Sequence, residues 1–205
     1  MEIKNRILVA AVELFMRNGI RSVSMDDIAT HLAMSKKTLY KWFENKDQIV
    51  LAVMQGHLSK EEVDCELAFA TGGNALEAMF NLINWHKEML ANLHPSIFHD
   101  LQKYYPQAWQ LFEQHKNTFI LQKIADNLRR GMAEGLYRPD LDVDVLARLH
   151  LAEIELMFDN VVFPPRQFGL QRVNSVMAEH FLMGISTLKG HRLINQYRNV
   201  TEPEV

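Results

Sequence analysis

Apolar residues recur along most of this chain at the three- and four-residue spacing of an amphipathic helix. The apolar face of the first such segment comprises Ile7, Ala11, Leu14 and Phe15. That segment ends at Asn18-Gly19, which is a common left-handed helix stop. No stretch alternates apolar and polar residues for long enough to make a convincing strand. The pattern therefore predicts an all-α protein.

Start and stop signals divide this pattern into about nine helices. Ser24 followed by Asp27 resembles a capping box, and Ser35 and Asn45 are placed to cap two further helices. Longer helices are expected over 47–70, 74–93, 106–134, 142–160 and 171–188, and a short one over 95–105. The tail from Gly190 is polar, and we expect it to fray.

Two short helices within residues 24–46 form a candidate helix-turn-helix. The first carries Ile28 and Leu32 on its inner face, and the second carries Leu39 and Phe43 at a four-residue spacing. Only a few residues separate the two helices. So tight a turn is typical of a helix-turn-helix, whose second helix can enter a major groove of DNA.

The outer face of the second helix carries the candidate chemistry. Cations, hydroxyls and large amphipathic rings are concentrated there, in Lys36, Lys37, Thr38, Tyr40, Lys41 and Trp42. With Lys46, residues 35–46 hold four lysines and one acid, Glu44. Most charge runs are merely solvated faces. Such a face would not need Tyr40 and Trp42 among its lysines, so we favour a DNA-binding surface.

The expected DNA contacts divide into positioning and reading, because phosphate contacts set the register whereas base-edge contacts carry sequence information. Helix N-termini attract phosphates, and we assign positioning to Ser24, Thr38, Lys41 and Lys46. Base-edge candidates are Lys36, Lys37 and Tyr40, since lysine can donate to guanine and a tyrosine ring can pack on a thymine methyl. The full expected set is Ser24, Ser35, Lys36, Lys37, Thr38, Tyr40, Lys41, Trp42 and Lys46.

The motifs of this region are Gly19-Ile20, Ser24-Met25, Ile28-Ala29, Met34-Ser35-Lys36-Lys37-Thr38-Leu39-Tyr40, Phe43 and Asn45-Lys46-Asp47. Together they resemble the N-terminal signature of the TetR family of bacterial transcriptional regulators. The match covers about the first quarter of the chain. Leu32 and Ala33 stand where small Ala and Gly are common in the family, and Trp42 replaces the frequent Tyr or His.

The resemblance implies a three-helix head over residues 1–50 that contains the helix-turn-helix. A larger helical ligand-binding and dimerisation domain would follow over 51–205. It further implies a homodimer on a palindromic, double-stranded DNA operator, joined by a four-helix bundle of the last two long helices. The last of these helices is also more apolar than one face needs, which suggests a partner. The candidate dimer face consists of Val173, Met177, Phe181 and Ile185.

Apolar and aromatic residues of the middle region are candidates for lining an effector pocket. They are Trp85, Met89, Phe98, Leu101, Tyr104, Trp109, Phe112 and Phe119. Such stripes are more often simple core, and composition alone favours core. Only the family resemblance makes a pocket for a small molecule the preferred interpretation.

Charge at first counts against a nucleic-acid partner, because the 205 residues include 22 Lys and Arg against 25 Asp and Glu. The distribution of charge along the chain changes this conclusion. Residues 1–50 have a formal charge of +2, and residues 51–205 have −5. An acidic body would tend to keep all but the basic head away from DNA.

Composition narrows the remaining classes of protein. Cys65 is the single cysteine, so no intramolecular disulfide or multi-thiolate zinc site can form within one chain, and a cytoplasmic location fits best. No apolar run approaches the roughly 18 residues of a membrane span. No cofactor is expected. We therefore predict a ligand-responsive transcriptional regulator, most simply a repressor, and not an enzyme.

Two alternatives stay open. One is a dimeric DNA-binding protein whose second domain is a filled core without an effector. The other is a metal-dependent enzyme on a helical bundle, which the nine histidines invite. No His-x-x-x-His pair occurs, and His150 with Glu153 supplies only two of the three or more ligands that a site needs.

Overall fold

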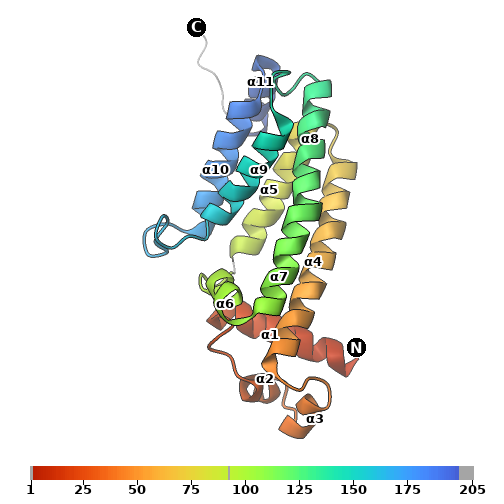
Figure 1. Cartoon of the computed structure of the whole chain (residues 1–205), viewed down its shortest axis with the longest axis vertical. Coiled ribbons are helices and arrows are strands. Elements are labelled where there is room, and N and C mark those ends of the chain that lie inside the picture. Colours follow the sequence, from red (N-terminus) through yellow and green to blue (C-terminus); the bar gives the residue numbers. More distant parts are fainter. Residues whose placement is uncertain (1, 92, 199–205) are drawn as a thin grey trace. The chain divides into compact units, whose positions relative to one another are not determined.

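The computed structural model describes residues 2–91 and 93–198, and its regular secondary structure is entirely helical (Figure 1). The elements are α1 (Ile3–Asn18), α2 (Met25–His31), α3 (Lys36–Tyr40), α4 (Lys46–Thr71), α5 (Ala75–Ala91), α6 (Ile97–Tyr104), α7 (Pro106–His115), η1 (Lys116–Ile120), α8 (Leu121–Ala133), α9 (Val143–Leu156), α10 (Leu170–Ile185) and α11 (Leu188–Tyr197). The all-α prediction is confirmed. No helix in the described part of the chain is both long and apolar enough to cross a membrane.

The structure refines one predicted helix and corrects the prediction for the tail. The helix expected over 106–134 is continuous, but it passes through the π-helical segment η1 between α7 and α8. The polar tail forms an additional helix, α11. Thr187 caps this helix by accepting a hydrogen bond from the Gly190 backbone N–H, and Ile194 is buried beneath it. Residues 199–205 of the predicted tail lie outside the described residues.

The chain packs as two compact units. The first comprises the described residues of 1–62 and 91–115, and the second those of 63–90 and 116–205. Helix α4 belongs to both units, and α6 and α7 pack with the N-terminal helices. The domain boundary predicted at residue 50 separates DNA binding from effector binding, and it stays a prediction. The packing units are divided at other positions.

The core of the first unit joins the helix-turn-helix to later parts of the chain. Ile7, Ile28, Leu39 and Ile49 come from α1 to α4 and are fully buried. Leu101, Tyr105 and Ala108 from the α6–α7 region belong to the same apolar cluster. The N-terminal helices therefore do not close their core alone.

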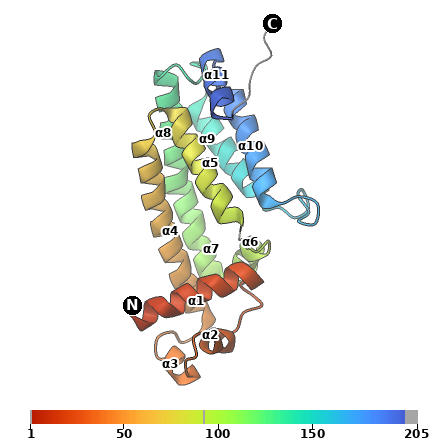
Figure 2. The same ribbon diagram turned by 180° about the vertical axis from the view of Figure 1, so that it is seen from behind.

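The second unit is organised around Tyr137, whose side chain is fully buried. Its hydroxyl donates to Asn127 Oδ1 at 2.9 Å, and Asn127 Nδ2 donates to the Ala75 carbonyl at 2.9 Å. Gly131 lets the ring approach, because a Cβ there would lie 2.0 Å from it. In this unit α9 lies between α8 and α10 in both views (Figures 1 and 2).

Candidate nucleic-acid interface and dimer face

Side-chain caps fix where α2 and α3 begin. Ser24 Oγ accepts a hydrogen bond from the Asp27 backbone N–H at 3.1 Å, and the Asp27 carboxylate accepts one from the Ser24 N–H at 2.8 Å. The Ser24 hydroxyl also donates to the Asp27 carboxylate at 2.7 Å, and this bond, together with that from the Ser24 N–H, holds the pKa of Asp27 below its usual value. Ser35 Oγ likewise accepts from the Thr38 N–H at 3.1 Å. The capping box at Ser24 and the cap at Ser35 are confirmed.

The turn between the two helices is closed by the Met34 backbone N–H, which donates to the Ala29 carbonyl at 2.9 Å. Ala33 occupies the left-handed region with φ of 49°. A Cβ is disfavoured there, which is the physical reason that glycine suits this position.

The surface formed by α3 and the turn that follows it, which we expect to meet DNA, is open to solvent. Lys37 and Lys41 are exposed, and Tyr40 and Trp42 keep 48% and 39% of their surface accessible. Leu39, on the opposite side of the helix, is fully buried in the core of the first unit. A buried anchor therefore presents cations and aromatic rings outward, as a recognition helix requires.

Lys36 differs from its neighbours because its ammonium contacts Asp26 of α2 at 2.6 Å. This hydrogen bond raises the pKa of Lys36. Both side chains are well exposed, so the pair contributes little stability. It does direct Lys36 toward the start of α2.

The structure gives Lys46 a role that sequence reasoning missed. Its half-buried ammonium donates to the carbonyls of Ile20 at 2.8 Å, Arg21 at 3.3 Å and Val23 at 2.7 Å. All three of its N–H donors therefore have partners inside the protein. Burial lowers the pKa of Lys46, and the Tyr105 ring centroid lies 5.6 Å from the nitrogen. Lys46 therefore has no N–H left to donate to a DNA phosphate, the contact that we expected from the sequence.

The same loop between α1 and α2 is attached to α6. The Arg21 backbone N–H donates to Asp100 Oδ2 at 3.0 Å, and its guanidinium donates to the Tyr104 hydroxyl at 2.9 Å. Asp100 is buried and also accepts from Ser96 Oγ at 3.1 Å. Gly19 permits this approach, because an added Cβ would lie 2.5 Å from Ser96 Oγ. Sequence reasoning missed Arg21 and Asp100, since nothing in a one-dimensional pattern links positions 79 apart.

Comparison with known proteins agrees with this geometry. Residues 7–53 match the model of the bacterial regulatory proteins, tetR family. These residues comprise most of α1, all of α2 and α3, and the first turns of α4. These findings support a regulator of the TetR family.

TetR-family relatives match well beyond this head. The transcriptional repressor KstR2 of Mycolicibacterium smegmatis is 27% identical over 148 residues, which are 71% of this chain and 72% of that protein. A TetR-family regulator from Marinobacter aquaeolei VT8 has the same fold, with a TM-score of 0.74, 20% identity and coverage of 98% and 100% of the two chains. The repressor FadR of Thermus thermophilus, solved with lauroyl-CoA, has a TM-score of 0.58 at 19% identity, over 90% and 95% of the chains.

The residues expected to line an effector pocket fall into both units of the chain. In the first unit Phe98, Trp109 and Phe112 form one aromatic cluster, with ring centroids 5.0 to 5.6 Å apart. Leu101 is buried in the core, and Tyr104 binds Arg21. These five residues are therefore engaged in packing.

In the second unit the Trp85 ring meets His86, with centroids 4.8 Å apart, and Met89 is half-buried. Phe119 lies beneath Lys123, 5.4 Å from its nitrogen, and lines a surface groove. Phe119 is thus the member of the expected set that contributes to this groove.

The side chains proposed for the dimer face have another role. Val173, Phe181 and Ile185 are buried within the second unit, and Met177 is half-buried. Phe181 stacks on the ring of His150 at 3.9 Å between centroids. Val173, Phe181 and Ile185 therefore stabilise a single chain and offer little free surface to a partner, whereas Met177 keeps part of its surface exposed. The dimer contact expected at these four residues stays a prediction, and the burial of three of them within one chain counts against it.

An exposed apolar stripe lies on α9 instead. Val145, Leu149 and Leu156 are 58%, 50% and 40% exposed, and their spacing of four and seven residues puts them on one helical face. Val176, on the adjacent α10, is 60% exposed. We call these four residues the α9–α10 stripe.

His150 and Glu153 do contact each other, at 3.3 Å between Nδ1 and Oε2. Within residues 2–91 and 93–198, no group of three or more His, Cys, Asp or Glu side chains is arranged to hold a metal ion. The His150 ring instead packs in the core against Phe181.

Proposed function

We propose that this TetR-family regulator is a homodimeric repressor that binds a palindromic operator and is released when a small molecule binds the domain over 51–205. The exposed cationic and aromatic face of α3 carries the proposal. On it, Lys37 and Tyr40 would read base edges, while Lys41 and Trp42 would contact the backbone. We further propose a cytoplasmic protein that catalyses no reaction, since its relatives are named as regulators.

Dimerisation would use the α9–α10 stripe. Exposed apolar side chains at helical spacing on two adjacent helices suit a four-helix bundle with a second copy. A dimer explains how two recognition helices could reach half-sites one DNA turn apart, about 34 Å. Lys36 would join the base contacts by exchanging its Asp26 partner for a guanine edge.

Release would act through the attachment of the head to α6. The contacts of Arg21 with Asp100 and Tyr104 join the loop before α2 to that helix. A ligand that displaced α6 would therefore change the setting of α2 and α3. A coupling of about 1–3 kcal/mol would weaken operator binding about 5- to 150-fold.

One observation favours the alternative of a DNA-binding dimer without an effector. Phe98, Trp109 and Phe112 pack edge to face or tilted against one another, as residues of a filled core do. The two candidates differ in whether any metabolite changes operator affinity. A screen of metabolite pools against the operator complex, read by fluorescence anisotropy, distinguishes them.

Selection of bound sequences from a random DNA library tests the DNA-binding function. The wild-type dimer should return a palindromic motif. Lys37→Ala should relax the preference at particular base pairs, each good contact being worth about 1–3 kcal/mol. Lys60→Ala serves as the matched control, because Lys60 is an exposed lysine on α4 away from α3. The same motif from Lys37→Ala and wild type would contradict the base-reading assignment.

A further inference from the structure

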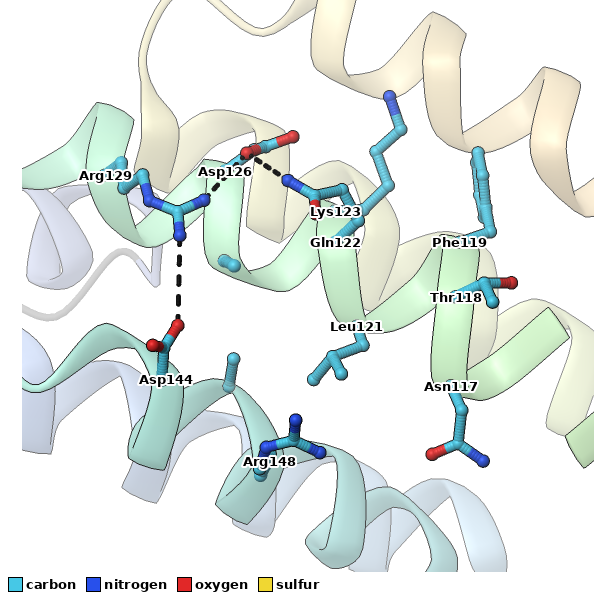
Figure 3. Close-up of a pocket in the computed structure, with 12 residues that line it drawn as sticks. Asn117, Thr118, Phe119, Leu121, Gln122, Lys123, Asp126, Arg129, Asp144 and Arg148 are labelled. Carbon is cyan, nitrogen blue, oxygen red and sulfur yellow. Dashed lines mark hydrogen bonds and ion pairs between the residues drawn. The ribbon is translucent and has the colours of Figure 1, made fainter. Parts of the chain in front are cut away.

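A groove of about 660 Å³ lies on the surface of the second unit. One wall comes from η1 and α8, and the other from the first turns of α9, as Figure 3 shows. The lining is mixed: the apolar side chains Phe119, Leu121, Ala125 and Ala147 lie among charged and amide groups. A cavity of this size and composition suits a small organic molecule with one polar end.

Most charges around the groove are already paired. Arg129 contacts Asp126 at 3.1 Å and Asp144 at 3.9 Å, which joins α8 to the start of α9. Lys123 pairs with Glu66. These acids and bases balance one another, so they add little net field inside the groove.

Arg148 is the exception. Its guanidinium points into the groove in Figure 3, on the same side as Leu121 and Asn117. The described residues include no carboxylate within ion-pair distance of it, and its side chain is exposed. Arginine stays charged at any physiological pH and presents a planar array of donors that fits a carboxylate through two hydrogen bonds.

The surroundings of Arg148 restrict the charge of an occupant. Glu66 offsets Lys123, and Asp126 and Asp144 lie on Arg129, so Arg148 is the cation of the lining to which no ion pair of the described residues is assigned. A polyphosphate would meet the two aspartates, whereas a single carboxylate would match the one guanidinium of Arg148. Leu121, Ala125 and Ala147 supply apolar lining in the same groove, which an occupant's hydrocarbon chain could contact.

We propose that this groove binds a monocarboxylate with an apolar tail, the carboxylate held by Arg148 and the tail lying on Leu121, Ala125 and Ala147. The α9–α10 stripe lies about a quarter turn around α9 from Asp144 and Arg148, at 100° per residue. Pairing through the stripe would therefore use a different face of α9 from the one that lines the groove. The proposal does not rest on the regulatory function, because binding is measured without DNA.

Isothermal titration calorimetry of the full-length protein tests the site with four probes: hexanoate, octanoate, octanol and inorganic phosphate. Octanoate should bind more tightly than hexanoate, by about fourfold for each methylene that is buried. Octanol lacks the carboxylate, and phosphate lacks the tail, so both should bind at least tenfold more weakly than octanoate.

Two variants and one control locate the binding. Arg148→Gln should weaken octanoate binding about ten- to a hundredfold, as expected for a charge-assisted hydrogen bond. Arg148→Lys should lie between Arg148→Gln and wild type, because it keeps the charge but not the paired donors. Arg192→Gln, an exposed arginine on α11 outside the groove, should bind as wild type does.

Three results would overturn the proposal. They are the absence of octanoate binding at millimolar concentration, equal binding by Arg148→Gln and wild type, and phosphate binding as tight as that of octanoate. Circular dichroism of each variant establishes that it is folded, so that a loss of binding reports the site.

Discussion

The contacts of Lys46 lead to a prediction that separates stability from DNA binding. Two of its hydrogen bonds, to Ile20 and Val23, have near-ideal lengths of 2.8 and 2.7 Å, and the third, to Arg21, is longer at 3.3 Å. A hydrogen bond from a charged group contributes about 1.5–3 kcal/mol. Because Lys46 is only half-buried, we take the lower end for the two short bonds and little for the third. Lys46→Ala should then lower the free energy of unfolding by about 2–3 kcal/mol.

Lys41→Ala is the matched control, since Lys41 is an exposed lysine of the same head. Its removal should change the unfolding free energy by less than about 0.5 kcal/mol. In DNA titrations at several salt concentrations, Lys41→Ala should reduce the slope of log K against log salt by about 0.9 for each head. Lys46→Ala should leave that slope unchanged.

Urea denaturation and fluorescence anisotropy supply the two measurements. The reasoning would be refuted by a Lys46→Ala protein that is as stable as wild type and has a reduced salt slope. That outcome would mean that the ammonium leaves its three carbonyls for a phosphate, as expected from the sequence alone.

Three further changes test other parts of the molecule. Ala33→Gly should raise the unfolding free energy by about 0.5–1 kcal/mol in urea titrations, because it relieves a left-handed alanine with φ of 49°. Leu149→Glu should shift dimer toward monomer in sedimentation velocity, whereas Val63→Glu, at a similarly exposed valine of α4, should not. Burial raises the pKa of Tyr105 to about 12, so stability should fall as pH rises from about 10 to 12, and Tyr105→Phe should reduce that fall.

Each of these has a contrary result. A less stable Ala33→Gly would show that chain entropy outweighs strain in the turn. An intact Leu149→Glu dimer would place the subunit contact away from the stripe. For tyrosine the sign follows from proton binding: the folded chain holds the Tyr105 proton in a pH range where the unfolded chain has released it. Identical pH profiles for wild type and Tyr105→Phe would contradict that assignment.

Local patterns were sufficient to predict the helix-turn-helix. Caps such as Ser24 with Asp27 act over three residues, and the buried face of α3 follows from the spacing of Leu39 and Phe43. These interactions are contained within one helical turn, so the sequence displays them directly. The alanine at position 33 could likewise be recognised as unusual, although only the backbone angle gives the reason.

Long-range partners could not be predicted. Asp100 and Lys46 are ordinary charged residues in the sequence, and their roles depend on a loop that lies 79 and about 25 positions away. The helix α11 was missed for a similar reason. Its few apolar residues do not form a periodic pattern that predicts a helix. Gly190 and Ile194 become buried because the preceding helices provide a surface for them.

The dimer face illustrates a limit of periodicity itself. Helical spacing shows that α10 has more apolar residues than one face requires, but it does not say which of them face the chain's own core. Phe181 and Ile185 are large and fully apolar, and they pack inward, where burial stabilises the monomer most. The residues left for a partner are the smaller exposed ones, Val145 and Val176, together with Leu149. A surface that must remain soluble before assembly is expected to be less apolar than the core beside it, so in a two-helix face the weaker apolar stripe is the better candidate for the interface.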